Sequence, residues 1–239
     1  MAKQEFRTGK SEATFERVRE TALSLFAEKG FEATTMREIS AASGLGLGAL
    51  YYYFRSKEDV VLSFYESVNR AVEKEFEAAP RGKNSAESFR ILMEIKLREL
   101  GPHRHLLRTI IKEAVDPKSR ICPLNPDSEK PLGLSLAIFQ TIAAQNSRLS
   151  PGEIHDMARG LWALHMGLLG YWIHDRSSDS GALDGSATQK AIDCAVSLLL
   201  WSERMTKIPG FSALRTQILG LVVALFPATT GPNSSEKTP

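Results

Sequence analysis

Apolar residues recur at spacings of three and four along most of the chain, which is the period of helices that bury one face. The first such segment can be capped by Ser11 and can end at Gly30, where a left-handed glycine would let Phe31 fold back onto the helix. Its apolar face consists of Phe15, Val18, Ala22, Leu25 and Phe26. We therefore predict a long first helix that stops at Gly30.

The next segment carries a helix-capping signal. Thr35 precedes Glu38 by three positions, so the hydroxyl and the carboxylate can close on the first backbone amides of a second helix. This helix is short, because Gly44 follows the last apolar position by only a few residues. A third element follows over residues 47–54. The pattern thus predicts two short helices on either side of a tight glycine turn.

The rest of the chain is helical in pattern as well. Ser56 opens a fourth helix that we predict to run to Ala79, with carboxylates in its first turn, where they interact favourably with the helix dipole. Four prolines mark residues 116–133 as a connector. The later predicted helices span residues 85–100, 102–115, 132–146, 150–175, 187–206 and 212–226. No segment shows the alternation of a strand, so the predicted fold class is all-α.

Composition narrows the function classes. With 43% apolar and 24% charged residues over 239 positions, the chain is an ordinary globular protein. The formal net charge is +2, so an anionic partner would have to be recognised by locally placed groups. Cys122 and Cys194 fit neither a disulfide framework nor a zinc site, so we expect no metal, no cofactor and a cytoplasmic location. The apolar runs are too short for a membrane span and the first residues lack a signal peptide, so we expect no membrane partner.

Three consecutive tyrosines stand in the third predicted helix. Leu50 and Phe54, four residues apart, must face the helical core, which leaves Tyr51 and Tyr53 to face outward or sideways. A phenol whose ring rests on the scaffold can donate its hydroxyl to a phosphate oxygen. We expect Tyr52, by contrast, to pack against the protein. The alternative is that all three rings merely pack.

Lys57 stands where a cation is unfavourable. It occupies the first turn of the fourth helix, where it opposes the helix dipole, whereas the neighbouring Glu58 and Asp59 obey the usual preference. An approaching phosphate would accept both this lysine and the positive end of the helix. We therefore interpret Lys57 as a phosphate contact.

Together these features resemble the DNA-binding part of the tetracycline-repressor (TetR) family of bacterial transcriptional regulators. The resemblance covers about Glu12 to Val72 and rests on Ala22–Phe31, Thr34–Thr35, Ile39–Ser40, Ala42–Leu45, Gly48–Phe54 and Ser56–Glu58. It implies a helix-turn-helix DNA-binding domain over residues 12–72, with its recognition helix over about 46–54. It further implies an α-helical ligand-binding and dimerisation domain, which we place over residues 73–228. The polar residues 229–239 we expect to be a disordered tail.

The resemblance also assigns DNA contacts residue by residue. Two fall in the second helix, most fall on the recognition helix, and one lies at the start of the fourth helix. They are Thr35, Arg37, Gly46, Leu47, Gly48, Ala49, Tyr51, Tyr53 and Lys57. Two of them depart from the family: Gly46 stands where Ser is most common, which removes a cap and a phosphate donor, and Tyr53 replaces the commoner His.

The function that the resemblance implies is that of a repressor that binds double-stranded DNA at a palindromic operator and is released by a small-molecule effector. One alternative is an α-helical enzyme. No nucleophile, base and carboxylate can be assembled from the spacings, and no glycine-rich phosphate loop is present, so we expect no enzyme. Another alternative is a protein-binding adaptor with a structural helix-turn-helix, which would leave Tyr51, Tyr53 and Lys57 unexplained.

Small residues suggest how the chain could assemble. A stripe of them runs along the 150–175 helix, and a similar set lies on the 187–206 helix, where another helix could approach closely. The first set is Gly160, Ala163, Gly167 and Gly170, and the second is Ala191, Ala195 and Ser202. Such stripes can pack within one chain, but the resemblance places a homodimer interface on the last long helices, and a two-fold dimer matches a palindromic operator.

The effector contacts are the feature that the sequence determines least. We select apolar residues and two polar ones from helical faces, because ligand pockets are mostly apolar with a few polar groups. The candidates are Phe89, Met93, Lys96, Leu97, Leu107, Phe139, Trp162, His165, Met166 and Trp172. Each can instead be a core residue. Lys96 and His165 favour a ligand with an acid or carbonyl group, because a polar group on an apolar face needs a partner.

Overall fold

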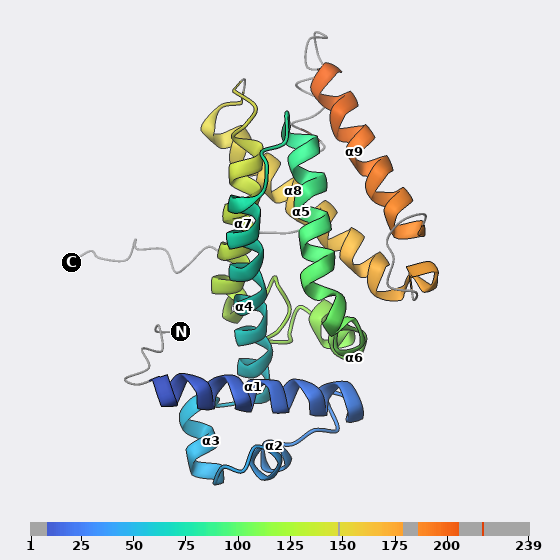
Figure 1. Ribbon diagram of the computed structural model, residues 1–239. Coiled ribbons are helices and arrows are strands. Elements are labelled where there is room, and N and C mark those ends of the chain that lie inside the picture. Colours follow the sequence, from blue (N-terminus) through green and yellow to red (C-terminus); the bar gives the residue numbers. More distant parts are fainter. Residues whose placement is uncertain (1–8, 148, 179–185, 206–216, 218–239) are drawn as a thin grey trace, which may run out of the picture.

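A computed structural model describes residues 9–147, 149–178, 186–205 and 217, and these residues form helices and no strand (Figure 1). The α-helices are α1 (Gly9–Lys29), α2 (Met36–Ala42), α3 (Leu47–Tyr53), α4 (Lys57–Ala78), α5 (Ser85–Leu100), α6 (Arg104–Val115), α7 (Glu129–Ala143), α8 (Pro151–His174) and α9 (Ala187–Met205). Short 3-10 helices span Gly101–His103, Pro126–Ser128 and Arg176–Ser178. The all-α prediction is confirmed. Apart from residue 217, the helix predicted over 212–226 and the tail over 229–239 lie outside the described residues.

Local capping signals determine the first three helices. Gly30 has a φ of 91°, and the ring of Phe31 meets that of Phe26 edge to face at 5.1 Å, which confirms the predicted end of α1. Thr35 and Glu38 form the predicted capping box at the start of α2. Ser11 does not cap α1, because it already lies inside that helix.

Helix α4 connects the three-helix unit, α1–α3, to the remaining helices. Ser56 caps its start by accepting from the backbone amide of Asp59, and Ala79 follows its last turn, as predicted. At 22 residues it is about 33 Å long. Figure 1 shows α1–α3 grouped at one end of α4, with α1 lying across it, and α5 and α7 beside its length. Helix α6 also packs on α1, so the three-helix unit has two supports.

The other helices enclose a second apolar interior. Helix α8 packs against α7 and α6, and α9 packs against α5 and α8. Helix α7 begins at Glu129, three residues before the predicted start, because Pro131 fits the first turn of a helix, where a backbone N–H is not needed. The predicted connector over 116–133 is therefore shorter than expected. Within the described part of the chain, no helix is long and apolar enough to cross a membrane.

Candidate nucleic-acid interface and ligand cavity

The outer face of α3 is a surface of small residues and tyrosines. Leu50 and Phe54 are fully buried and fix the orientation of the helix, and the ring of Phe54 stacks on Phe15 of α1 at 4.6 Å. The residues of α3 and its N-cap that are exposed are Gly46, Gly48, Ala49, Tyr51 and Tyr52, and Leu47 is half-buried. Gly46 makes no side-chain cap. The backbone of this helix can therefore approach a flat partner closely.

The three tyrosines are placed differently from one another. Tyr52 is 71% exposed and Tyr51 is 46% exposed. The expectation that Tyr52 packs against the protein is wrong, because it lies one turn after Gly48 on the outer face of α3. Tyr53 is half-buried, and its hydroxyl lies 3.4 Å from the hydroxyl of Ser11 in α1. Two tyrosines are thus presented outward and one is tied to the scaffold.

The two predicted contact residues of α2 are both exposed. Thr35 closes the capping box: its Oγ1 accepts from the amide of Glu38 at 3.2 Å, and its own amide donates to Glu38 Oε2 at 2.9 Å. Lys29 adds an ion pair to Glu38 at 2.9 Å. These donors lower the pKa of the Glu38 carboxyl to about 2. Arg37 stands beside this rigid cap.

Lys57 has partners within the three-helix unit. Its Nζ donates to the carbonyl oxygen of Phe31 at 2.7 Å and to that of Glu32 at 3.3 Å, and it lies 4.6 Å from the centre of the Phe31 ring. The ammonium therefore holds the start of α4 against the turn between α1 and α2. These contacts within the chain offset the unfavourable position of a cation in the first turn of a helix.

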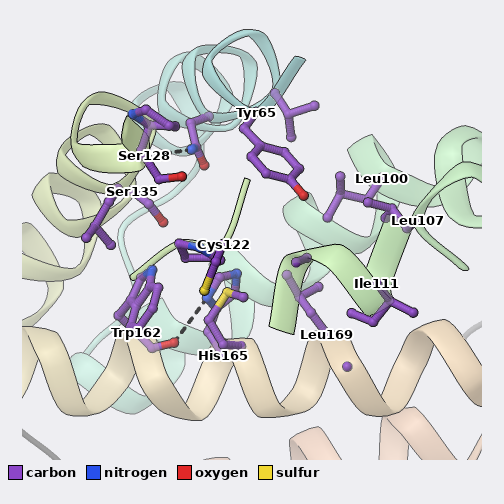
Figure 2. Close-up of a pocket in the computed structure, with 18 of the residues that line it drawn as sticks. Tyr65, Leu100, Leu107, Ile111, Cys122, Ser128, Ser135, Trp162, His165 and Leu169 are labelled. Carbon is purple, nitrogen blue, oxygen red and sulfur yellow. Dashed lines mark hydrogen bonds between the residues drawn. The ribbon is translucent and has the colours of Figure 1, made fainter. Parts of the chain in front are cut away.

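A cavity of about 390 Å³ lies between α4, α5, α6, α7 and α8 (Figure 2). Its wall is mainly apolar, and residues 122–124 of the connector between α6 and α7 close one side. Figure 2 shows Tyr65 across the cavity from Trp162 and His165. Burial raises the pKa of the Tyr65 phenol, so it stays protonated. The apolar lining includes Val68, Leu100, Leu107, Ile111, Pro131, Leu132, Met166, Leu169 and Ile173.

A buried lysine is the main polar feature of the cavity. Lys96 is 4% exposed, and its Nζ donates to Asn69 Oδ1 at 3.2 Å and to Ser135 Oγ at 3.3 Å. Asn69 is oriented in turn, because its Nδ2 donates to the carbonyl of Pro131 at 3.0 Å. Burial lowers the pKa of Lys96 to about 7. The ring of Phe139 lies behind the ammonium, 6.0 Å from its centre.

His165 adds a second polar group to the same cavity. It is 2% exposed, its Nδ1 lies 3.2 Å from the carbonyl oxygen of Trp162, and its ring centre is 5.2 Å from that of Phe139. Among the described side chains, its Nε2 is a buried polar atom without a hydrogen-bond partner. Burial first, and then the charge of Lys96, hold the pKa of the imidazole well below its ordinary value. The ring is therefore neutral at physiological pH.

Comparison with known proteins identifies the family. Residues 18–64, which comprise most of α1, all of α2 and α3 and the start of α4, match the family described as bacterial regulatory proteins, tetR family. This part of the chain is a TetR-family DNA-binding unit. The uncharacterised HTH-type transcriptional regulator YerO of Bacillus subtilis is 31% identical over 108 residues, which are 44% of this chain and 37% of YerO.

Two further likenesses extend the comparison. The HTH-type transcriptional repressor KstR2 of Rhodococcus jostii is 52% identical over 40 residues, which are 17% of this chain and 20% of KstR2. The structure of a TetR transcriptional regulator from Nitrosomonas europaea superposes with a TM-score of 0.60 at 18% identity, over 79% of this chain and 99% of that one. It shares the fold. The chain spans between a third and a half of the length of the first curated relatives that it matches.

The cavity is lined by half of the predicted ligand contacts. Lys96, Leu107, Trp162, His165 and Met166 line it. The other five fill helix interfaces and do not line the cavity; they are Phe89, Met93, Leu97, Phe139 and Trp172. The sequence did not separate the two groups, because a helical stripe identifies burial and not the part of the interior that side chains leave unfilled.

Several lining residues were not predicted from the sequence. Asn69 and Ser135 orient Lys96, and Tyr65 and Cys122 line the wall. Asn69 had a signal, because it is a polar residue directly beside the apolar positions of α4. Cys122 had none, since it lies in a connector without helical periodicity.

Proposed function

We propose that this TetR-family protein is a sequence-specific DNA-binding transcriptional regulator that acts as a repressor. The observation that carries the proposal is the outer face of α3 and its N-cap. This face contains no core residue and consists of the exposed residues Gly46, Gly48, Ala49, Tyr51 and Tyr52. A recognition helix needs such an outward face to enter the major groove. KstR2, which is 52% identical to this chain over 40 residues, is named a transcriptional repressor, and this supports repression rather than activation.

We assign the DNA contacts to α2, α3 and the start of α4. The small residues Gly48 and Ala49 admit close approach and apolar contact with thymine methyl groups. The hydroxyls of Tyr51 and Tyr52 can donate to phosphate oxygens, and Arg37 is the candidate for a guanine. Thr35, Gly46, Leu47, Tyr53 and Lys57 complete the assigned set.

We further propose a homodimer that binds a palindromic operator. Large apolar side chains are exposed on two helices that pack against each other: Tyr171 on α8 at 49%, and Leu198 and Trp201 on α9 at 61% and 55%. Gly167 is exposed on α8 one turn before Tyr171. Ala195, in contrast, is buried within the chain, so this member of the α9 set packs internally.

We assign the effector site to the cavity. A ligand there contacts α4, whose first turn adjoins the recognition helix. In a dimer, the two recognition helices can lie at a spacing that fits DNA or at one that does not. A ligand that binds better to the second arrangement would release the operator. A loss of about 100-fold in operator affinity requires about 2.7 kcal/mol of such preference, which lies within the range of allosteric coupling. We infer that the protein acts through binding and not through catalysis.

A gel shift with DNA upstream of the chain's own coding region tests the proposal. We expect a retarded band that unrelated DNA of equal length does not compete away. Tyr51→Ala combined with Tyr52→Ala should abolish the band while the thermal unfolding temperature stays unchanged, because both rings are exposed. Binding that persists in this variant, or that shows no sequence preference, would contradict the proposal.

A further inference from the structure

The ammonium of Lys96 is buried without a counter-ion. Its two hydrogen-bond partners, Asn69 and Ser135, are neutral, and among the described residues it forms no ion pair. Removing an ammonium from water is costly, and buried charges are normally paired. The buried carboxylate of Asp59 shows the usual arrangement, because it pairs with Arg120 at 3.0 Å.

The environment of Lys96 holds its charged end in one place. Asn69 cannot rotate its amide freely, since its Nδ2 is bound to the carbonyl of Pro131, so Oδ1 is kept toward Nζ. Ser135 supplies the second acceptor. An ammonium has three N–H donors, and these two contacts occupy two of them. The third is available to an acceptor in the cavity that Lys96 lines.

His165 offers the opposite hydrogen-bonding character. A carbonyl oxygen accepts only, so the contact with Trp162 places the proton of the neutral ring on Nδ1. Nε2 is then an acceptor without a partner among the described side chains, and it belongs to a side chain that lines the cavity. Lys96 and His165 both lie against the ring of Phe139, so the donor and the acceptor are neighbours.

The remaining wall is suited to hydrocarbon. Leu100, Leu107, Ile111 and Leu169 line the cavity, and Figure 2 shows them on the side opposite Ser135 and Trp162. A ligand that fits has an apolar body and one polar end. The polar end must supply a negative charge for Lys96 and a hydrogen-bond donor for His165.

We propose that the cavity binds an apolar carboxylic acid, with its carboxylate on Lys96 Nζ and a hydroxyl near the carboxylate donating to His165 Nε2. The inference deepens the proposed function and rests on it only in taking the cavity as the effector site. The carboxylate would be the missing counter-ion of the lysine. The apolar body would lie between α6 and α8.

The test is calorimetric titration of the full chain, without DNA, with four probes of equal chain length: 3-hydroxyoctanoate, octanoate, 1-octanol and octylamine. We expect affinity to fall in that order, with a loss of about ten-fold or more from octanoate to 1-octanol, because a charge-assisted hydrogen bond is removed. Equal binding of octanoate and 1-octanol, or stronger binding of octylamine, would overturn the assignment of the acid.

Variants separate the two contacts. Lys96→Met should bind octanoate no better than 1-octanol, and Lys96→Arg should restore the preference for the acid. Lys112→Met, the same change at an exposed lysine on α6, is the matched control and should behave as wild type. His165→Leu should keep the preference for octanoate over 1-octanol but lose the advantage of 3-hydroxyoctanoate. If Lys96→Met retains the preference while unfolding at the wild-type temperature or above, the lysine is not the carboxylate partner.

Operator release is measured separately, by gel shift with each acid that binds. An acid that binds in the predicted order but leaves operator affinity unchanged would support the ligand chemistry and contradict release by this ligand. A protein that binds its operator but discriminates none of the four probes would contradict the ligand chemistry and leave the DNA-binding function standing.

Discussion

Arg120 joins the wall of the cavity to the start of α4 through Asp59. Its Nη2 lies 3.0 Å from Asp59 Oδ1, and its Nη1 donates to the Ser56 hydroxyl at 2.9 Å. The other oxygen of Asp59 accepts from the amide of Arg55, which lies between α3 and α4, at 3.1 Å. Since Ser128, which lines the cavity, donates its hydroxyl to the carbonyl oxygen of Arg120 at 3.0 Å, hydrogen bonds lead from the cavity wall to the residue that follows the recognition helix.

We predict from this contact that Arg120 couples the cavity to the DNA-binding helices. Arg120→Ala should leave ligand affinity near wild type, because the side chain does not line the cavity, but should reduce the ligand-induced loss of operator affinity by about five-fold or more. Gel shifts with and without ligand measure the ratio. Lys118→Ala, an exposed neighbour, is the control. An unchanged ratio in Arg120→Ala would exclude this contact as part of the coupling.

Arg37 and Lys57 should differ in their effect on sequence preference. Arg37→Ala should relax preference at one base position at a cost of about 1–3 kcal/mol, because a base contact is lost. Lys57→Ala should weaken binding to all sequences alike. It should also lower the free energy of unfolding by about 1–3 kcal/mol, because the carbonyls of Phe31 and Glu32 lose a charged donor. Selection from an operator library, with thermal unfolding alongside, checks both; a uniform loss in Arg37→Ala would refute its specific role.

We predict that removing the hydroxyl of either exposed tyrosine weakens operator binding. Tyr51→Phe and Tyr52→Phe keep the rings and remove the hydroxyls, so each should weaken operator binding by a factor of about ten, the value of a hydrogen bond to a charged group. Neither change should alter the unfolding temperature, since the rings are exposed. Filter-binding titrations measure the affinities. If both variants bind as tightly as wild type, these phenols do not contact phosphate.

The capping box predicts how the stability of the three-helix unit depends on pH. The pKa of Glu38 is lowered from 4.5 to about 2 in the folded state. The ionised carboxylate therefore contributes fully to folding stability at pH values above 4.5, and this contribution is lost as the pH falls toward 2. Glu38→Gln should therefore be less stable than wild type at neutral pH, and the difference should shrink below about pH 4.5. Urea unfolding at several pH values measures it. A difference that stays constant down to the acid limit would contradict this account.

Gly167 predicts a test of the dimer. Among the described residues, a Cβ at this position would meet no atom within 4 Å outside the nearby backbone of its own helix, so Gly167→Leu should not disturb the fold of the single chain. In the proposed dimer the added side chain would face the partner, and we expect monomers that no longer bind the operator. Light scattering after size exclusion, with a gel shift, measures both properties. Gly152→Leu on the same helix, also without a neighbour within 4 Å, is the control; a stable, DNA-competent Gly167→Leu dimer would exclude this face.

The helices themselves could be predicted from the sequence, because their signals are local. Gly30 and the pair Thr35 and Glu38 act within one turn of backbone, and their conformations follow from the orphan amides and carbonyls at helix ends. Ser56 likewise starts α4 where expected. The errors at Ser11 and at the start of α7 are shifts of a few residues, where a helix extends past one signal to another.

The surface of α3 was predicted only in part. The periodicity identified Leu50 and Phe54 as core and Tyr51 as outward, but it assigned Tyr52 to the interior. One helix can leave a wide face uncovered when it packs on few neighbours, and the width of that face depends on the angle at which α3 meets α2 and α1. That angle is a tertiary property.

By itself, the sequence determined most of the helix boundaries, the family resemblance and the burial of Lys96 and Phe139 on apolar faces. Only the tertiary structure decided that the first lines a cavity and the second lies behind it, because a helical stripe shows which side of a helix faces inward and not which interior volume stays unfilled. The pairing of Arg120 with Asp59, 61 positions apart, was equally beyond reach. Contacts of that separation depend on the packing of whole helices, and no local spacing encodes them.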